Sequence, residues 1–465
     1  MGILGLNTYI CNIIIGPWSL LLKVHTVRIL FLCKNFQRMK SIRIRDFRCF
    51  EDVTIDFRSG INLLVGNNGV GKTSLLQACK YTMSAFFSGY SDENTSWIGF
   101  SNDDFREIMR DGVVLPDRAV QIDFDMSDFW PDLSGTNYLK KNSKKNSRML
   151  LEGLRDYKQW GGHLQDTLFD RVRNVQCQAL PLFAFFSTED IHQTRSISGN
   201  KFSTYHQKNS FGYYECTSSN GLFSYWVKRL LVLEEGHEHI QEVEIVRRAI
   251  HDVLGSEGCG VIDDIDIRPN QRKVYFLLTD GRQVPSEQLS DGYRRVANIV
   301  VDLAFRAALL NRGLYGTEAC QQTTGTALID EIDMHLHPSL QISILKALHR
   351  VFPRIQFIAT THAPLVMSGV ENNDENVVYK MDYADGAYRF SLVHTYGLNI
   401  SDIAMVVQGV QPRDATVDSS LAELFSLIDE ERFNEAREKL ESLKGEWGNY
   451  MPDLQKAETM IELMQ

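Results

Sequence analysis

Residues 66–73 read Gly-Asn-Asn-Gly-Val-Gly-Lys-Thr and fit the phosphate-loop pattern G-x-x-x-x-G-K-[ST]. The glycines let the backbone wrap around a phosphate, so that N–H groups and the start of the next helix point at negative charge. Lys72 can then reach the β- and γ-phosphates, and the Thr73 hydroxyl can ligate Mg²⁺. The expected nucleotide-binding residues in this loop are Asn67, Asn68, Gly69, Val70, Gly71, Lys72, Thr73 and Ser74.

The elements around this loop are those that a phosphate loop requires. The apolar run 61–65 predicts a buried strand directly before it, and residues 74–87 predict a helix directly after it. Alternating residues on both sides of 48–52 predict two further short strands joined by a turn.

A second chemical element is the acid pair Asp330 and Glu331, which ends the apolar run 327–329. Such a run predicts a buried strand that delivers its carboxylates at the edge where open α/β sheets bind ligands. We expect Asp330 to hold the Mg²⁺ and Glu331 to polarise the attacking water. Taken alone, the pair is equally compatible with an ordinary strand that ends in surface acids.

His362 follows another short apolar strand pattern, at 356–360, about one helix beyond the acid pair. A single histidine after a strand is more often structural than catalytic. Because the helix 339–352 separates the two strands, however, we expect them to be neighbours, with His362 near the γ-phosphate. Ser290, Asp291 and Gly292 open the apolar helix 297–310, and a helix N-terminus of this kind can bind a second anion.

In the chain the order is phosphate loop, Ser290–Gly292, acid pair and His362, and these four elements together resemble the ABC-type ATPase domain of the SMC, Rad50, RecF and overcoming-lysogenization-defect (OLD) families. The resemblance covers residues 40–130 and 280–400. It implies an α/β fold like a RecF or SMC head, with ATP and Mg²⁺ as cofactors and Lys72, Glu331 and His362 as catalytic residues. It also implies that Ser290, Asp291 and Gly292 form a signature that completes the site of a second subunit, in a head-to-tail dimer or higher oligomer.

Two further segments extend this resemblance. Residues 332–338 match the D-loop in the D-x-H-L-H-P form of OLD-like ATPases. Residues 47–50 match the N-F-R-x-F turn of these families, with Asp46 in place of the asparagine, and this places Arg48 near the nucleotide. No glutamine is assigned to the Q-loop, since Gln121 lies on a predicted strand.

The composition limits the class of protein. The chain has 465 residues, 43% of them hydrophobic, which is typical of a globular protein of two or three structural units. Its formal net charge of -10 argues against a protein that coats nucleic acid. The eight cysteines form no C-x-x-C pair, which favours a reducing cytoplasm. The apolar runs before Met39 are too short and too interrupted for a membrane span, and Met39 is a candidate natural start.

We therefore divide the chain into five parts. Residues 1–38 are a candidate non-native or poorly ordered extension, and 39–130 hold the first part of the ATPase domain. Residues 131–279 are a mostly helical insertion, in which the lysine-rich run 131–148 is an expected exposed loop. Residues 280–400 hold the second part of the ATPase domain, and 401–465 form a C-terminal helical partner-binding segment.

The C-terminal segment resembles that of the PtuA family, the ATPases of Septu and some retron anti-phage systems, at 409–414 and 422–443. That resemblance implies a regulatory and assembly subunit whose partner is an HNH nuclease of the PtuB kind. In retron versions a reverse transcriptase and its RNA–DNA product join the assembly. In this tail Leu421, Leu424, Leu427 and Ile428 form one apolar helix face, which either meets a partner or packs on its own domain.

Two alternatives stay open. The first is a RecF-like repair ATPase that binds DNA through residues 140–148 and through Arg294 and Arg295. The second is a nucleotide-binding scaffold without hydrolysis, against which the intact Lys72, Glu331 and His362 weigh. No nuclease site is predicted in this chain, because the acids at 382–385 are too sparse.

Overall fold

The computed structural model describes residues 38–107, 109–110, 113–114, 118–126, 137–144, 148–150, 152–170, 175–188, 208–218, 221–236, 241–411 and 413–464. The expected extension 1–38 lies outside these residues except for its last position. Two compact units divide at 397/398, and each is described by itself. In the part of the chain so described, no helix is both long and apolar enough to cross a membrane.

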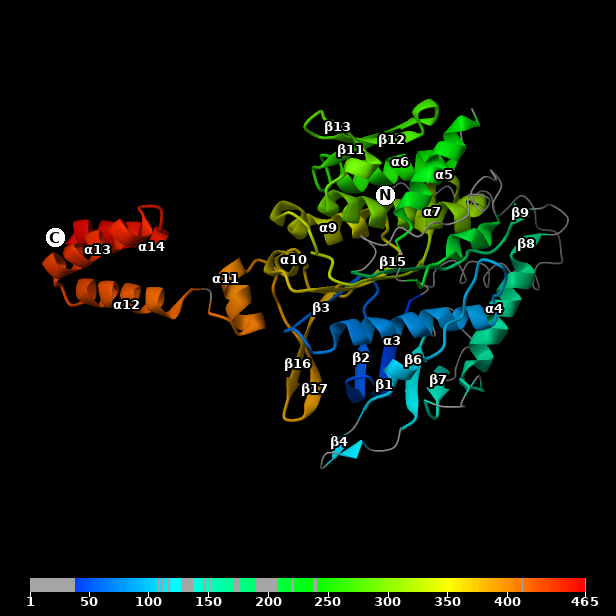
Figure 1. Ribbon diagram of the computed structural model, residues 1–465, viewed down its shortest axis with the longest axis horizontal. Coiled ribbons are helices and arrows are strands. Elements are labelled where there is room, and N and C mark those ends of the chain that lie inside the picture. The colour runs from blue at the N-terminus through cyan, green and yellow to red at the C-terminus, as the bar shows by residue number, and fades with distance from the viewer. Residues whose placement is uncertain are drawn as a thin grey trace, which may run out of the picture. The chain divides into compact units, whose positions relative to one another are not determined.

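A six-stranded sheet forms the centre of the first unit (Figure 1). In spatial order its strands are β10 (Leu182–Phe186), β14 (Gly325–Ile329), β15 (Ile355–Thr361), β3 (Ile61–Val65), β16 (Val377–Ala384) and β17 (Ala387–Leu392). The first five run parallel, and β17 returns antiparallel to β16. Every residue of β3, β10, β14 and β15 is buried, as expected for parallel strands covered on both faces. The α/β fold class is confirmed.

The strand order brings the predicted motifs to one edge. The strand β15 lies between β14 and β3, so the strand before His362 pairs with the strand before the acid pair, as expected. Ala359 lies opposite Ile329, and Thr361 lies opposite Val65. The carboxyl ends of the three strands therefore meet where nucleotides bind in open α/β sheets.

A four-stranded antiparallel sheet forms a second layer, in the order β2 (Phe50–Asp56), β1 (Ser41–Phe47), β6 (Val120–Asp125) and β7 (Asn137–Lys141). The helix α3 (Lys72–Ser84) contacts β6 of this sheet as well as β14 and β15 of the main sheet (Figure 1). The two strands predicted around the turn 48–52 are present, but their turn is shorter than expected. The expectation of an exposed loop throughout 131–148 was wrong at 137–141, because Leu139 is buried and this stretch pairs with β6.

Helices cover the other face of the main sheet (Figure 1). The 25-residue helix α7 (Asp291–Tyr315) packs against α5 (Phe223–Glu235), α6 (Gln241–Leu254) and β10, and α6 also packs against α9 (Pro338–Val351). A three-stranded sheet of β11 (Ile262–Arg268), β12 (Lys273–Leu278) and β13 (Gln283–Pro285) contacts α5 and α6. The remaining short elements are β4 (Met109–Arg110), β5 (Val113–Val114), α4 (Arg155–Thr167), β8 (Phe169–Asp170), β9 (Val175–Gln176), α8 (Ala319–Gln322) and α10 (Pro364–Ser368).

The segment expected as a mostly helical insertion does contain α4, α5 and α6, and it also supplies β10 of the main sheet. Buried ion pairs and their hydrogen bonds join α5 to α6 and to α7. On α7, Arg306 forms two hydrogen bonds with Asp302, and the Trp226 indole donates to the same carboxylate at 2.7 Å. Arg229 and Glu242 join α5 to α6 with both side chains fully buried. Each charge is compensated by hydrogen bonds, which is the condition for burying it.

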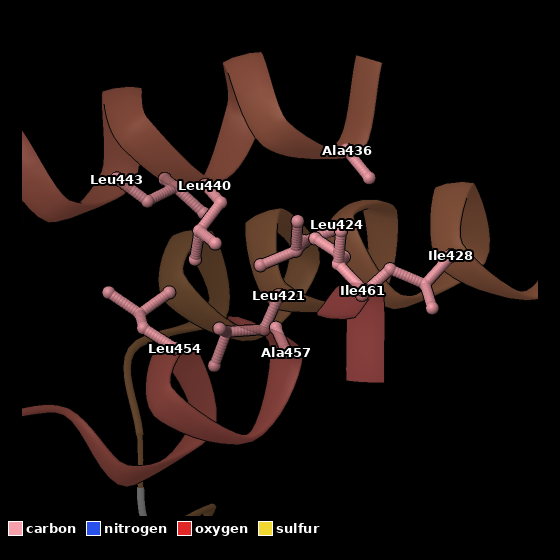
Figure 2. Close-up of a cluster of buried hydrophobic side chains, with 9 residues drawn as sticks. All are labelled: Leu421, Leu424, Ile428, Ala436, Leu440, Leu443, Leu454, Ala457 and Ile461. Atoms are coloured by element: carbon pink, nitrogen blue, oxygen red, sulfur yellow. The ribbon is translucent and has the colours of Figure 1, made fainter. Parts of the chain in front are cut away.

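The second unit is a three-helix bundle preceded by the short helix α11 (Ile400–Ile403) and a π-helical turn, Ala404–Gln408. Its helices are α12 (Ala415–Asp429), α13 (Phe433–Trp447) and α14 (Pro452–Met464), with a break between α13 and α14 at 448–451. Their apolar faces meet in one small core (Figure 2).

The apolar face of α12, for which the sequence allowed either a partner or its own domain, packs into the core of the bundle. Leu421, Leu424 and Ile428 are buried against Leu440 of α13 and other core residues, and Leu427 packs at its edge (Figure 2). This face therefore packs on its own unit. The outer surface of the bundle carries the acids of this unit and a few exposed apolar side chains, among them Tyr450 and Leu463.

Candidate nucleotide-binding site

The phosphate loop leaves the buried strand β3 and enters α3 through three glycines with left-handed backbone. The φ angles are 149° at Gly66, 81° at Gly69 and 90° at Gly71. A Cβ at Gly66 would lie 2.4 Å from the Met381 carbonyl oxygen, and one at Gly71 would lie 2.8 Å from both Cys49 Sγ and Phe50 Cζ. Only glycine satisfies both the backbone conformation and these contacts.

The start of α3 is open to an anion. Its N-cap is Gly71, which has no side chain to accept hydrogen bonds from the first turn. The first N–H groups of a helix have no acceptor within the helix, so they point outward together with the positive end of the helix dipole. Asn67, Asn68 and Gly69 are exposed in the loop above them, and Val70 is buried beneath it. The loop therefore fits a phosphate group.

Lys72 lies inside this loop and bonds to it. Its Nζ donates to the carbonyl oxygens of Gly66 at 2.8 Å and Asn67 at 3.0 Å. Burial lowers the pKa of Lys72 to about 8, against the opposing effect of nearby acids, chiefly Glu331. A triphosphate supplies negative charge in place of neutral carbonyls, so it favours the protonated lysine.

The proposed metal ligands meet at one oxygen atom. The Thr73 hydroxyl lies 3.3 Å from Asp330 Oδ1, and the Thr360 hydroxyl donates to the same oxygen at 2.7 Å. Asp330 is almost fully buried. Mg²⁺ is bound through one or two carboxylates, hydroxyls, waters and substrate phosphates, and this donor set beside a phosphate loop fits that chemistry. The role of Thr73 and Asp330 as metal ligands is a proposal.

Glu331 is held in a backbone conformation that a glutamate rarely adopts. Its φ is 46°, in the left-handed region. Hydrogen bonds to one residue of β15 hold it there: the Glu331 N–H donates to Thr360 Oγ1 at 2.8 Å, and the next N–H, of Ile332, donates to the Thr360 carbonyl oxygen at 3.0 Å. Such strain persists only where neighbours fix the backbone. Thr360 therefore holds Glu331 and Asp330 at the same time, a role that the sequence patterns did not reveal.

His362 and the D-loop are tied to the same strand end. The Thr361 hydroxyl donates to Asp333 Oδ1 at 2.5 Å and accepts the Ala363 N–H at 3.0 Å. Burial lowers the pKa of the half-buried His362, and Lys72 lowers it further, while Asp333, Glu331 and Asp330 act in the opposite direction. His362 thus lies within the electrostatic reach of Lys72 and both acids, where a neutral imidazole can contact a phosphate.

The predicted signature caps α7. Ser290 is its N-cap and accepts the Tyr293 N–H, and both Ser290 and Asp291 are exposed. Gly292 is buried against the D-loop, and a Cβ there would lie 2.4 Å from the His335 carbonyl oxygen. The signature and the D-loop of one chain therefore adjoin, with Ser290 and Asp291 facing outward. Their action on the site of a second subunit remains a prediction.

Arg295 has a role that the sequence patterns missed. Its side chain is fully buried and donates to the Ser187 carbonyl oxygen at 2.5 Å and the Asp330 carbonyl oxygen at 2.8 Å. It thereby joins the first turns of α7 to the ends of β10 and β14. The alternative that Arg295 contacts DNA was wrong for this reason. Arg294 donates to the Glu287 carbonyl oxygen.

Arg48 lies in the tight turn between β1 and β2, with left-handed backbone at both Asp46 and Arg48. Its Nε donates to Asp104 Oδ1 at 2.9 Å, and its N–H donates to the Asp104 carbonyl oxygen. Asp104 is fully buried and also accepts the Tyr81 hydroxyl of α3 at 2.5 Å. Asp104 thus fixes Arg48 relative to the helix of the phosphate loop. The placement of Arg48 beside the nucleotide stays a proposal.

A phosphate loop, a strand-end acid pair, a histidine on the intervening strand and a serine-capped signature helix on this sheet define an ATPase of the ABC type. The chain belongs to the family described as "AAA domain, putative AbiEii toxin, Type IV TA system", whose profile matches residues 61–368.

Relatives match over most of the chain. It is 21% identical to the Retron Vc95 probable ATPase of Vibrio cholerae over 433 residues, which cover 80% of this chain and 79% of the relative. It is 21% identical to the Septu protein PtuA of Bacillus thuringiensis over 407 residues, which cover 86% and 91% of the two chains. A crystal structure of the SmcHead bound to the C-winged helix domain of ScpA aligns with a TM-score of 0.45 at 13% identity, over 77% of this chain and 97% of the other.

The substitution Thr360→Val tests whether the Thr360 hydroxyl positions Asp330 and Glu331. It keeps the shape of the side chain but removes both the donor to Asp330 and the acceptor for the Glu331 N–H. We expect kcat for ATP hydrolysis to fall about tenfold or more, since a buried group loses its partner. The Kd for ATP, measured by titration calorimetry, should change less than about threefold.

Thr360→Ser should restore most of the rate. Thr326→Val is the matched control. The Thr326 hydroxyl is also buried, but Thr326 is near the start of β14, away from the acid pair, and its hydroxyl bonds to Gln356 of β15. A normal kcat in Thr360→Val, or an equal loss in Thr326→Val, would show that Thr360 does not position Glu331.

The lowered pKa of Lys72 predicts a pH dependence of ATP binding. Bound triphosphate favours the charged lysine, so affinity is fully present below about pH 8 and declines as the free loop loses its proton above that value. We expect the Kd for ATP to be about tenfold weaker at pH 9 than at pH 7. Calorimetry near pH 8 should show proton uptake as a buffer-dependent enthalpy. Equal affinity at both pH values, with no uptake, would contradict the assignment.

Proposed function

We propose that this chain hydrolyses ATP with Mg²⁺ in a composite site shared by two copies, and that it thereby regulates and assembles an anti-phage defence complex with a partner nuclease. The proposal of a composite site rests on the separation of the predicted nucleotide-binding residues into two groups. The phosphate loop, Asp330, Glu331 and His362 meet at one sheet edge, while Ser290 and Asp291 are exposed at the start of another helix.

In this site Lys72 and the first turn of α3 bind the phosphates. Thr73 and Asp330 would hold the Mg²⁺, which would supply positive charge beside the phosphates. Glu331 polarises the water, and His362 contacts the γ-phosphate. A second copy adds Ser290, Asp291 and Gly292 from the start of its own α7, where the positive end of the helix dipole favours the same phosphate.

The defence part is supported by the named relatives, a retron ATPase and a Septu PtuA, which match along most of this chain. The nuclease part is supported by the resemblance of residues 409–414 and 422–443 to the PtuA family. The partner is an HNH nuclease of the PtuB kind, and in a retron arrangement also a reverse transcriptase with its RNA–DNA product. The nucleotide state of the ATPase controls the nuclease, so slow turnover is sufficient for this role.

The second unit supplies a surface for such a partner. In residues 398–465, fourteen Asp and Glu oppose six Lys and Arg, so this short segment has a formal net charge of -8, which is most of the net charge of -10 of the chain. The apolar faces of its three helices fill its own core, and its acids lie outside this core, beside exposed apolar residues such as Tyr450 and Leu463. Such a surface repels nucleic acid and attracts a basic protein face.

Some of the basic residues expected to bind DNA in a RecF-like repair ATPase form contacts within this chain instead. Arg295 is buried, and Lys141 donates to the Phe100 carbonyl oxygen. The arginines on β1 are paired as well, Arg43 with Asp52 and Arg45 with Asp123. Direct contact with DNA or RNA is therefore not the function that we propose for this chain.

Glu331→Gln tests the hydrolytic site. The amide keeps the shape of the side chain but cannot polarise water as a carboxylate does, so we expect hydrolysis to fall about a hundredfold or more. ATP binding should persist, and dimers should accumulate with ATP in sedimentation velocity. Glu446→Gln, in the second unit, is the control and should behave as wild type. Turnover within a factor of about two of wild type would remove Glu331 as the base.

Neutralising the outer acids of the bundle tests the docking surface. The triple variant Glu423→Gln, Glu435→Gln, Glu441→Gln should retain ATP binding but co-purify about tenfold less with an HNH nuclease encoded beside this gene. The control replaces three similarly exposed glutamates of the first unit, Glu93, Glu107 and Glu375, by glutamine. If the control loses the nuclease and the bundle variant retains it, the acidic surface is not the docking element.

A further inference from the structure

The geometry of the phosphate site indicates on which side the base of a bound nucleotide lies. Glu331 and His362 follow β14 and β15, and both strands lie on the same side of β3. The terminal phosphate must lie on that side for these two residues to act on it. The base is at the opposite end of the nucleotide, and the opposite side of β3 is occupied by β16.

The hairpin of β16 and β17 continues past the phosphate loop on that side. The last pair between β16 and β3 is Lys380 with Val65, the residue directly before the loop. Beyond it, β16 extends through Ala384, paired only with β17 (Figure 1). The Met381 carbonyl oxygen lies against Gly66, at 2.4 Å from the position of a Cβ there. The end of the hairpin therefore borders the phosphate loop on the side where the base is expected.

Two tyrosines lie directly opposite each other near the tip of this hairpin. Tyr383 of β16 pairs with Tyr388 of β17, and their ring centroids are 4.8 Å apart. Tyr388 in turn meets Phe50 edge-on at 5.0 Å, and Phe50 packs against Gly71, the N-cap of α3. A continuous series of contacts therefore links the phosphate loop to Tyr383.

Side-chain exposure rises along β16 toward the tip of the hairpin. Met381, two residues earlier on the same face of β16, is buried at 1% exposure, whereas Tyr383 is 59% exposed. Its ring contacts that of Tyr388, so it offers an exposed aromatic surface on the hairpin that borders the phosphate loop. A base stacks favourably on such a ring whatever its hydrogen-bonding edge.

We propose that Tyr383 stacks on the purine base of the bound nucleotide, with Tyr388 as its support. This assignment rests on the proposed nucleotide site at residues 66–73 and adds a base subsite to it. Stacking does not read the edges of the base, so the subsite takes adenine and guanine nucleotides alike. It contributes nothing to binding of the phosphate chain itself.

The test compares nucleotides with a phosphate chain that has no base. Kd values for Mg²⁺–ATP, Mg²⁺–GTP and Mg²⁺–tripolyphosphate are measured by calorimetry for the wild type, Tyr383→Ala and Tyr383→Phe. Tyr383→Ala should weaken ATP and GTP about tenfold and leave tripolyphosphate unchanged. Tyr383→Phe should stay within about twofold of wild type, because the ring remains. Tyr450→Ala, an exposed tyrosine of the second unit, is the control.

Each measurement is repeated in a Ser290→Arg background, which blocks the signature contact, so that loss of a subunit contact is not mistaken for loss of stacking. Unchanged ATP affinity in Tyr383→Ala overturns the base subsite. An equal loss for tripolyphosphate, or a loss seen only without Ser290→Arg, overturns it too. If the wild type binds neither ATP nor tripolyphosphate, the nucleotide site itself fails, which is a separate result.

Discussion

The buried carboxylate of Asp330 is the point at which the separate parts of the ATPase meet. One of its oxygens is shared by Thr360 of β15 and Thr73 of α3, and its backbone carbonyl accepts from Arg295 of α7. A buried charge is tolerated only when hydrogen bonds and a cation compensate it. The positions of the phosphate loop, the histidine strand and the signature helix are therefore mutually dependent, because each contributes a hydrogen bond to this one residue.

This dependence explains how nucleotide state can alter the surface of the molecule. A bound Mg²⁺ would compete with Thr73 and Thr360 for the Asp330 oxygen that they share, and Lys72 would exchange its loop carbonyls for phosphate oxygens. Any shift of Asp330 acts through Arg295 on the first turn of α7. The exposed Ser290 and Asp291 lie at that end of the helix, so a local change in charge is coupled to the surface proposed to meet a second copy.

Much of this arrangement could be predicted from the sequence, because the relevant patterns are local. The glycines of residues 66–71 and the acids after β14 occupy fixed positions at strand ends, and strand order follows from the helix between β14 and β15. Contacts distant in sequence could not be predicted in this way. Thr360, Asp104 and Arg295 carry no local pattern, and their roles arise only when β15, the β1–β2 turn and α7 meet. The apolar face of α12 was ambiguous for a related reason, since amphipathic periodicity does not say which surface covers it.

The central claim is that each nucleotide is held by the loop of one chain and the signature of another, and mixing two inactive variants tests it most directly. Lys72→Ala lacks a working loop, and Ser290→Arg lacks a working signature. In a mixed dimer the intact loop of one chain meets the intact signature of the other. Mixing equal amounts should restore roughly a quarter of wild-type hydrolysis, since half of the dimers are mixed and each has one intact site. No recovery on mixing, or full activity of Ser290→Arg alone, would contradict the shared site.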